Sequence, residues 1–227
     1  MKKIAVLQSN YIPWKGYFDI IHDVDEFIFY DEVQYTKNDW RNRNRIYTPA
    51  GVQWLTIPVE GHISKSIDEV HVVRDKWQQK HYNALVTNYS KAPCFSRYKE
   101  FLQYVYLERK WDYLFELNRW LIQTISRDFL GITTVFTDSR TYASEGTGHQ
   151  KLLSLLISAG AEYYLSGPAA KDYIIAADYE KAGIELHWKD YSGYPEYPQM
   201  HEPFDHYVSI LDLLFNVGED APKYIWG

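Results

Sequence analysis

Two residues of this 227-residue chain are the first candidates for acid–base chemistry, His81 and Asp31. The imidazole of His81 titrates near neutral pH, so it suits removal of a proton from an attacking amine or hydroxyl group. Asp31 directly follows an apolar run, where a carboxylate can orient an amine or a Mg²⁺ ion. Both residues also have ordinary explanations, because a lone helical histidine is commonly structural and an aspartate there can cap a helix.

A dense group of arginines and asparagines occupies Trp40–Arg45. If strand alternation begins at Arg41, then Arg41, Arg43 and Arg45 share one face. Guanidinium groups bind phosphate or carboxylate bidentately, so these residues, together with Lys37, predict an anion clamp. A solvated sheet edge that resists aggregation explains the same arginines about equally well.

Aromatic side chains lie among amide, hydroxyl and ammonium groups in Gln8–Phe18, where Pro13 and Gly16 predict a loop. Indole and phenol rings can stack on a sugar or a nucleobase, although packing explains most of the 21 tyrosines and eight tryptophans. This reasoning gives a first set of substrate-binding candidates: Gln8, Trp14, Tyr17, Lys37, Trp40, Arg41, Arg43, Ser166 and Gly167.

Two short glycine motifs come before predicted helices. Gly146-Thr147-Gly148 precedes a helix with Lys151 in its first turn, and backbone N–H groups at such a position can bind phosphate. The spacing matches neither a Walker loop nor the dinucleotide fingerprint, so a flexible connector is an alternative. Ser166-Gly167-Pro168 forms a strand-to-helix turn, in which Ser166 can simply cap the helix.

The elements that position these residues are those of an α/β protein. The apolar runs Ile4–Leu7 and Phe27–Tyr30 predict buried strands. Three later helical segments each end in glycine, at Gly131, Gly160 and Gly183, and a short apolar run follows each. Helices between such runs are the crossovers of parallel strands, so we expect a mostly parallel sheet with helices on its faces. Ligands of such sheets bind at the carboxyl ends of the strands.

Further segments complete the expected single domain, residues 1–227. A turn at residues 48–51 predicts a β-hairpin near the N-terminus, and Ile67–Val73 alternates like a strand. Helical periodicity over about 77–130 predicts an additional helical layer. An extended, proline-containing segment from Tyr191 to Pro203 precedes a last helix that Ser209 caps.

Composition restricts the class of function. The net charge of −6 disfavours general nucleic-acid binding, which requires an extended basic surface. No apolar run approaches a membrane span, and the start of the sequence lacks the apolar region of a signal peptide. The single cysteine, Cys94, excludes an internal disulfide, so a cytoplasmic location is expected. The histidines show no metal-ligand spacing, so no metal site is expected.

The sequence resembles the WbqC-like family over almost its whole length. The matching segments are Gln8–Asp19, Tyr30–Lys37, Trp40–Ile46, Trp77 with Lys80-His81, Leu165–Gly167 with Tyr173, Tyr197–Gln199 and Ser209–Asn216. The resemblance adds Lys80 to the catalytic candidates, and it adds Asn10, Tyr11, Lys15, Tyr173 and Gln199 to the substrate-binding candidates.

The resemblance also implies a function. Members of this family look like cytoplasmic proteins of O-antigen and other surface-polysaccharide gene clusters, with transfer of glycine or a similar acyl group to an amino sugar as the implied activity. We therefore expect a transferase that acylates a nucleotide-linked amino sugar, with an activated acyl donor or with ATP and Mg²⁺. The alternatives are a non-catalytic protein that binds sugar nucleotides and an ATP-dependent ligase or nucleotidyltransferase, to which the first loop bears a fainter likeness. A homodimer stays open.

Overall fold

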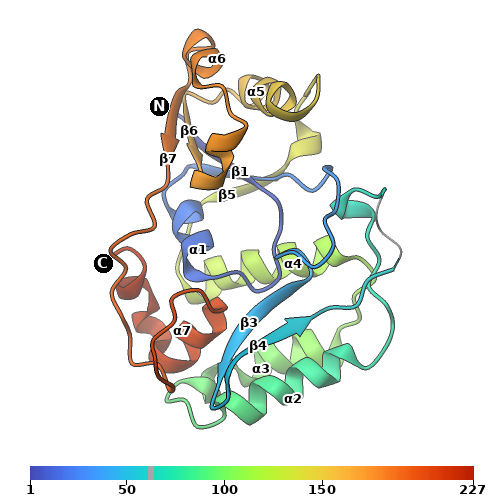
Figure 1. Ribbon diagram of the computed structural model, residues 1–227, viewed down its shortest axis with the longest axis vertical. Coiled ribbons are helices and arrows are strands. Elements are labelled where there is room, and N and C mark those ends of the chain that lie inside the picture. The colour runs from blue at the N-terminus through green and yellow to red at the C-terminus, as the bar shows by residue number, and fades with distance from the viewer. Residues whose placement is uncertain (61–63) are drawn as a thin grey trace.

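The computed structural model describes residues 1–60 and 64–227, and a five-stranded parallel sheet lies at one end of the molecule (Figure 1). Its strands are β1 (Lys3–Leu7), β2 (Glu26–Phe29), β5 (Val135–Asp138), β6 (Tyr163–Ser166) and β7 (Glu185–Trp188), in the order β5-β2-β1-β6-β7. The chain builds outward from β1 to β5 on one side and then returns to β6 on the other. The predicted, mostly parallel α/β sheet is confirmed, and its strand order reverses between β1 and β6.

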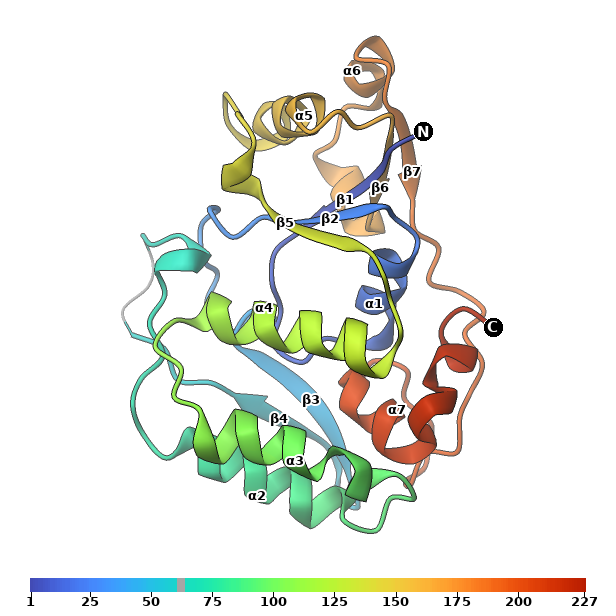
Figure 2. The same cartoon turned by 180° about the vertical axis from the view of Figure 1, so that it is seen from behind.

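Alternating side chains explain why both faces of this sheet are covered. Ile4 and Val6 of β1 belong to the apolar cluster that contains Leu155, whereas Ala5 belongs to the cluster that contains Phe18. The covering helices are α1 (Lys15–His22) and α4 (Leu114–Thr124) on one side and α5 (Gly148–Ser158) and α6 (Ala176–Lys181) on the other. Figure 2 shows these two groups of helices on opposite sides of the strands. Burial on both faces is the usual environment of parallel strands.

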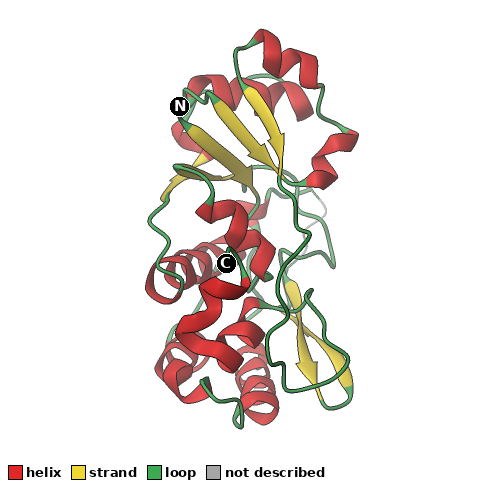
Figure 3. Cartoon of the chain, turned by 90° about the vertical axis from the view of Figure 1, so that its left-hand side faces the viewer, coloured by secondary structure: helices red, strands yellow, loops and turns green. Residues whose placement is uncertain are grey.

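The other end of the molecule consists of the predicted hairpin and helical layer (Figure 3). Strands β3 (Arg43–Thr48) and β4 (Gly51–Thr56) pair antiparallel, as expected. Beside them lie α2 (Trp77–Tyr89), α3 (Lys99–Gln103) and α7 (Ile210–Val217), and the Ser209 hydroxyl caps α7. One apolar cluster runs from the sheet through this layer, since it includes Phe27, Leu85 and Leu214.

One expected element was wrong. Ile67–Val73 does not form a strand, because its first residues make the short 3₁₀ turn Ile67–Glu69. The Ser66 side chain and the Glu69 carboxylate form a capping box that stabilises this turn. Only isolated bridges follow within the described segment, at His71 and Val72. None of the helices in the described residues has the length and apolar character needed to cross a membrane.

Candidate functional site

A cavity of about 940 Å³ lies at the carboxyl ends of the strands where their order reverses. Leu7 and Gln8 at the end of β1 line it, and so do Ser166 and Gly167 at the end of β6. In open parallel sheets this point is a crevice, since the connections from neighbouring strands diverge there. We call it the switch-point cavity.

The N-terminus of α5 forms one wall of the switch-point cavity, through Gly146, Thr147, Gly148 and Lys151. Gly146 and Gly148 have φ angles of +85° and +53°, a region that glycine adopts without strain. The first amides of a helix have no intrahelical acceptor, so they are available to an anion. The Lys151 ammonium lies 2.9 Å from the Glu32 carboxylate, which holds this lysine at the cavity wall.

Arg41 supplies a second cationic group to the switch-point cavity. Its guanidinium lies 2.8 Å from the Asp39 carboxylate, while its Nε atom is buried without a hydrogen-bond partner. Because each of these cations already has a carboxylate partner, they provide hydrogen-bond donors more than a strong net positive potential. Arg43 lies outside the cavity, with its guanidinium carbon 4.4 Å from the centre of the Trp54 ring.

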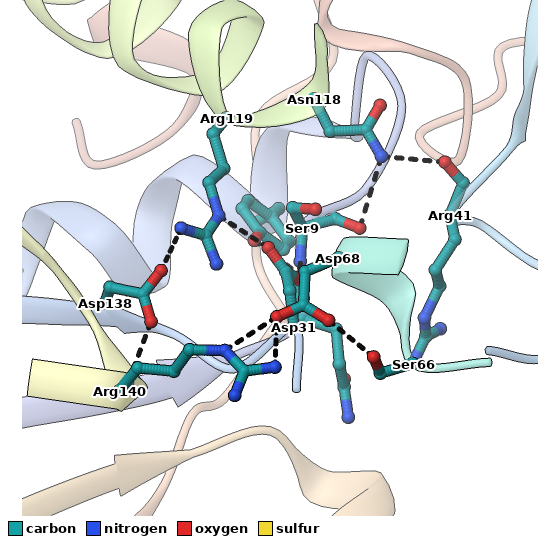
Figure 4. Close-up of polar contacts among 11 residues, drawn as sticks. Ser9, Asp31, Arg41, Ser66, Asp68, Asn118, Arg119, Asp138 and Arg140 are labelled. Atoms are coloured by element: carbon teal, nitrogen blue, oxygen red, sulfur yellow. Dashed lines mark hydrogen bonds and ion pairs between the residues drawn. The ribbon is translucent and has the colours of Figure 1, made fainter. Parts of the chain in front are cut away.

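The loop after β1 is held by buried polar side chains, which Figure 4 shows. The backbone N–H of Ser9 donates to the Asp31 carboxylate over 2.7 Å, and the Asn118 amide lies 3.4 Å from the carbonyl oxygen of Ser9. The same amide donates to the carbonyl oxygen of Arg41 over 2.8 Å, which ties this loop to the segment after β2. Ile12 has a φ angle of +35°, which is rare for a β-branched residue. Such strain persists only where surrounding contacts over-determine the backbone, as they do at ligand sites.

Asp31 is fully buried and belongs to a chain of charges at the carboxyl edge of the sheet. Arg119 Nε donates to Asp31 over 2.6 Å, and the same guanidinium binds Asp138 (Figure 4). Burial raises the pKa of the Asp31 carboxyl, while the Arg119 charge and the Ser9 N–H oppose that rise. Both carboxylate oxygens of Asp31 have partners, and the residue does not line the cavity. The contacts therefore describe a positioning role for Asp31.

His81 lies in the helical layer, away from the switch-point cavity. It is 5% exposed, its Nε2 atom lies 3.2 Å from the carbonyl oxygen of Thr56, and its Nδ1 atom lies 2.8 Å from the Tyr11 hydroxyl. Because a carbonyl oxygen can only accept, Nε2 carries the proton and Nδ1 accepts from Tyr11. Burial lowers the pKa of His81 to about 4, so the ring is neutral at pH 7. Lys80 is exposed on α2.

A second cavity of about 470 Å³ adjoins the first. The two cavities share Asn10, Trp14 and Trp40, and Trp54 and Tyr207 complete the aromatic walls of the smaller one. We call it the aromatic recess. Gly16 makes room for the Trp14 ring, because a Cβ atom at Gly16 would lie only 2.3 Å from it.

The structure brings together part of the predicted set. The candidates that line at least one cavity are Gln8, Asn10, Trp14, Tyr17, Trp40, Arg41, Ser166, Gly167 and Tyr173. The candidates that line neither are Tyr11, Lys15, Asp31, Lys37, Arg43, Lys80, His81 and Gln199.

Two of these outlying candidates bind the C-terminal part of the chain instead. The Lys15 ammonium donates to the carbonyl oxygens of Pro195 and Tyr224 over 3.2 and 3.1 Å, and burial lowers its pKa to about 8. The Gln199 amide donates to the buried Asp212 carboxylate over 2.8 Å.

Sequence reasoning missed several residues around the site. Arg119 and Asn118 lie within the predicted helical layer, and nothing in their spacing indicates that they hold a distant loop. Trp54 and Tyr207 reach the aromatic recess from β4 and from the segment before α7. The glycine motif at residues 146–148 did carry a local signal, although a connector explained it as well.

Comparisons with known proteins match almost the whole chain to one family. The sequence model of the WbqC-like protein family matches residues 8–224. The chain is similar to a protein of Mycobacterium tuberculosis that is described as uncharacterized protein Rv1507c, at 45% identity over 227 residues, covering 99% of this chain and 98% of the relative. No solved structure matches the chain. Among the described residues, no group of three or more His, Cys, Asp or Glu side chains is placed to hold a metal ion.

Proposed function

The chain belongs to the WbqC-like protein family, and on that premise we propose that it acylates the amine of a nucleotide-linked sugar with glycine or a similar small acyl group. The observation that carries this proposal is the switch-point cavity, in which the N-terminus of α5 faces the ends of β1 and β6. A cytoplasmic location, where sugar nucleotides are made, is part of the proposal.

A diphosphate group fits the wall formed by α5. The amides near Gly148 and the Lys151 ammonium are the donors that phosphate oxygens require, and the helix dipole favours negative charge there. Arg41 adds a guanidinium fork, whose unpartnered Nε can donate to the same anion. The volume of about 940 Å³ lies within the range of small-molecule sites.

The acylation step places separate demands on the cavity. The neutral amine nitrogen of the sugar attacks the carbonyl carbon of an activated ester or thioester, and the leaving group departs with the electron pair of the broken bond. The carbonyl oxygen gains negative charge in the tetrahedral intermediate, and the backbone at Ser166-Gly167 or the Gln8 amide can donate to it. The amine proton needs an acceptor. The departing alkoxide or thiolate takes it, and we propose that Glu32 acts only through the Lys151 ammonium that it holds at the cavity wall.

Incubation of the purified chain with UDP-glucosamine and a set of activated glycyl donors tests the proposal. The expected result is a sugar nucleotide heavier by one acyl group, detected by mass spectrometry. Lys151→Met and Glu32→Gln should each lower the rate of product formation at least about tenfold, if each removes roughly one charge-assisted hydrogen bond. Lys80→Met is the matched control, because Lys80 is exposed and lines neither cavity. Equal rates in all of these variants would contradict the assigned site.

A second function has one observation in its favour. Among the described residues that line the switch-point cavity, none is a histidine, aspartate or glutamate. A protein that only binds a sugar nucleotide has no need of such a group. Thermal stabilisation of the chain by UDP-glucosamine, with no mass gain under any donor, would favour this non-catalytic function.

A further inference from the structure

The aromatic recess contains exposed aromatic side chains, a composition typical of a ligand-binding site. Trp40 and Trp54 are 42% and 43% exposed, and Tyr207 is 62% exposed. Large aromatic side chains that remain exposed and gather in one place usually mark a binding surface, since burying them would otherwise stabilise the fold. These three come from different segments, namely the loop after β2, the strand β4 and the segment before α7.

The rings form two inclined pairs. The centres of Trp14 and Tyr207 lie 5.4 Å apart with an angle of 36° between their planes, and those of Trp40 and Trp54 lie 5.5 Å apart at 37°. Rings this close touch each other, so a ligand packs on their outer faces and edges and not between them. Such faces can contact the C–H groups of a saturated ring as well as a planar base, so the polar side chains decide between the two.

The polar side chains of the recess favour a sugar as its ligand. Asn10 lines both cavities, and its side-chain oxygen is buried with no hydrogen-bond partner. A buried acceptor without a partner costs free energy, which a ligand hydroxyl or ammonium group would recover. The other amide, Asn44, is already used, since it donates to the carbonyl oxygens of Tyr11 and Ile12. Asn10 is thus the acceptor that remains for a ligand.

We propose that the aromatic recess holds the amino-sugar ring of the substrate, with Asn10 accepting from a hydroxyl or ammonium group of that ring. This inference rests on the proposed function and assigns one part of the substrate to each cavity. The sugar lies beside Trp54 and Tyr207 with its amine at the shared boundary near Asn10, so that the acyl carbonyl lies toward Gln8 in the switch-point cavity. The diphosphate extends past Trp14 and Trp40 toward α5. Figure 1 shows α5 at the sheet end of the molecule and the hairpin toward the other end.

Binding of two ligands that differ only in the sugar tests this assignment. Titration calorimetry with UDP-glucosamine and with UDP compares wild type with Trp54→Ala and Tyr207→Ala. We expect each substitution to lower the affinity for UDP-glucosamine about tenfold, the size of a lost ring-stacking contact, and to leave the affinity for UDP unchanged. Tyr104→Ala is the matched control, because Tyr104 is a 37% exposed aromatic residue outside both cavities.

The results separate this inference from the proposed function. Equal losses for UDP and UDP-glucosamine would overturn it, because the recess would then hold the base, and unchanged affinities for both ligands would overturn it as well. Saturation-transfer NMR with methyl glucosaminide supplies an arm that needs no nucleotide. Saturation transfer that Trp54→Ala abolishes supports the recess as a sugar site even if UDP does not bind, a result that would count against the proposed function alone. Transfer that persists in Trp54→Ala and Tyr207→Ala would contradict the inference.

Discussion

Two buried polar clusters of this protein invite comparison, one at the carboxyl edge of the sheet and one in the helical layer. At the edge, Asp31 and Arg119 form a charged pair beneath the loop that lines the switch-point cavity. In the helical layer, His81 joins Tyr11 and Tyr106 through neutral hydrogen bonds. Both clusters contain residue types that suggest catalysis, yet neither lines a cavity. Their side chains hold the backbone, while aromatic rings, amides and glycines face the ligand space.

Breaking the charged cluster should have the largest effect on stability. Asp31→Ala leaves the Arg119 guanidinium, whose side chain is 14% exposed, with Asp138 as its one remaining acidic partner among the described residues. We expect the free energy of unfolding to fall by about 3–5 kcal/mol, the cost of removing one partner of a buried ion pair. Urea denaturation followed by circular dichroism measures the loss.

The matched control for Asp31 lies in the same network. Asp68 pairs with Arg140, whose side chain is 58% exposed. The Nε atom of Arg140 lies 2.8 Å from the Asp68 carboxylate. Asp68 itself is 14% exposed, but Asp68→Asn leaves a solvated Arg140 and an amide that can still accept from Ser66, so it should cost at most about 1 kcal/mol. Similar losses for Asp31→Ala and Asp68→Asn would show that burial does not distinguish the two pairs.

The neutral cluster around His81 should make the free energy of unfolding depend on pH. His81 has a pKa of about 4 in the fold, so the unfolded chain takes up a proton at this residue between about pH 6.5 and 4 while the folded chain does not. The contribution of His81 is complete above pH 6.5 and is lost as pH falls through this window, by about 3 kcal/mol in total. His81→Gln cannot take up that proton, so its stability should fall less steeply with acid than that of the wild type. Parallel curves for the two proteins, from urea denaturation between pH 7.5 and 4.5, would contradict the neutral histidine.

Substitution of Gly16 should have a smaller effect, on ligand affinity, because Gly16 makes room for the Trp14 ring that lines both cavities. In Gly16→Ala the new methyl group displaces the Trp14 ring, which also packs against Tyr191 and Tyr194. Affinity for UDP-glucosamine should fall about tenfold, or roughly 1.4 kcal/mol, with a changed tryptophan emission spectrum. Ala143→Ser is the control, because Ala143 lies outside both cavities and its substitution should leave the affinity unchanged. Gly183→Ala would be a poor control, because the backbone φ of +73° at Gly183 strains a residue that has a side chain. An unaltered affinity in Gly16→Ala would show that the position of Trp14 is not critical.

The two clusters also show what the sequence could and could not predict. Apolar runs and helix-ending glycines predicted the parallel sheet, because local periodicity and backbone preference decide those elements. The loop at Gln8 and the turn at Ser166 were placed at strand ends, where their cavity follows from the topology. The role of Arg119 was not predictable, since its partners Asp31 and Asp138 lie 88 and 19 residues away in the chain. His81 looked reactive because burial, which lowers its pKa, leaves no mark in the residues beside it.

Glycine amides offer the most direct test of the central claim that a sugar nucleotide binds where the strand order reverses. The chain contains twelve glycines, so selective ¹⁵N-glycine labelling gives a short, assignable spectrum. On addition of UDP-glucosamine, the amide signals of Gly146, Gly148 and Gly167 should shift, while those of Gly131 and Gly183, which lie outside the cavity, should stay in place. Shifts at Gly131 or Gly183 without any at Gly146, Gly148 and Gly167 would contradict the account.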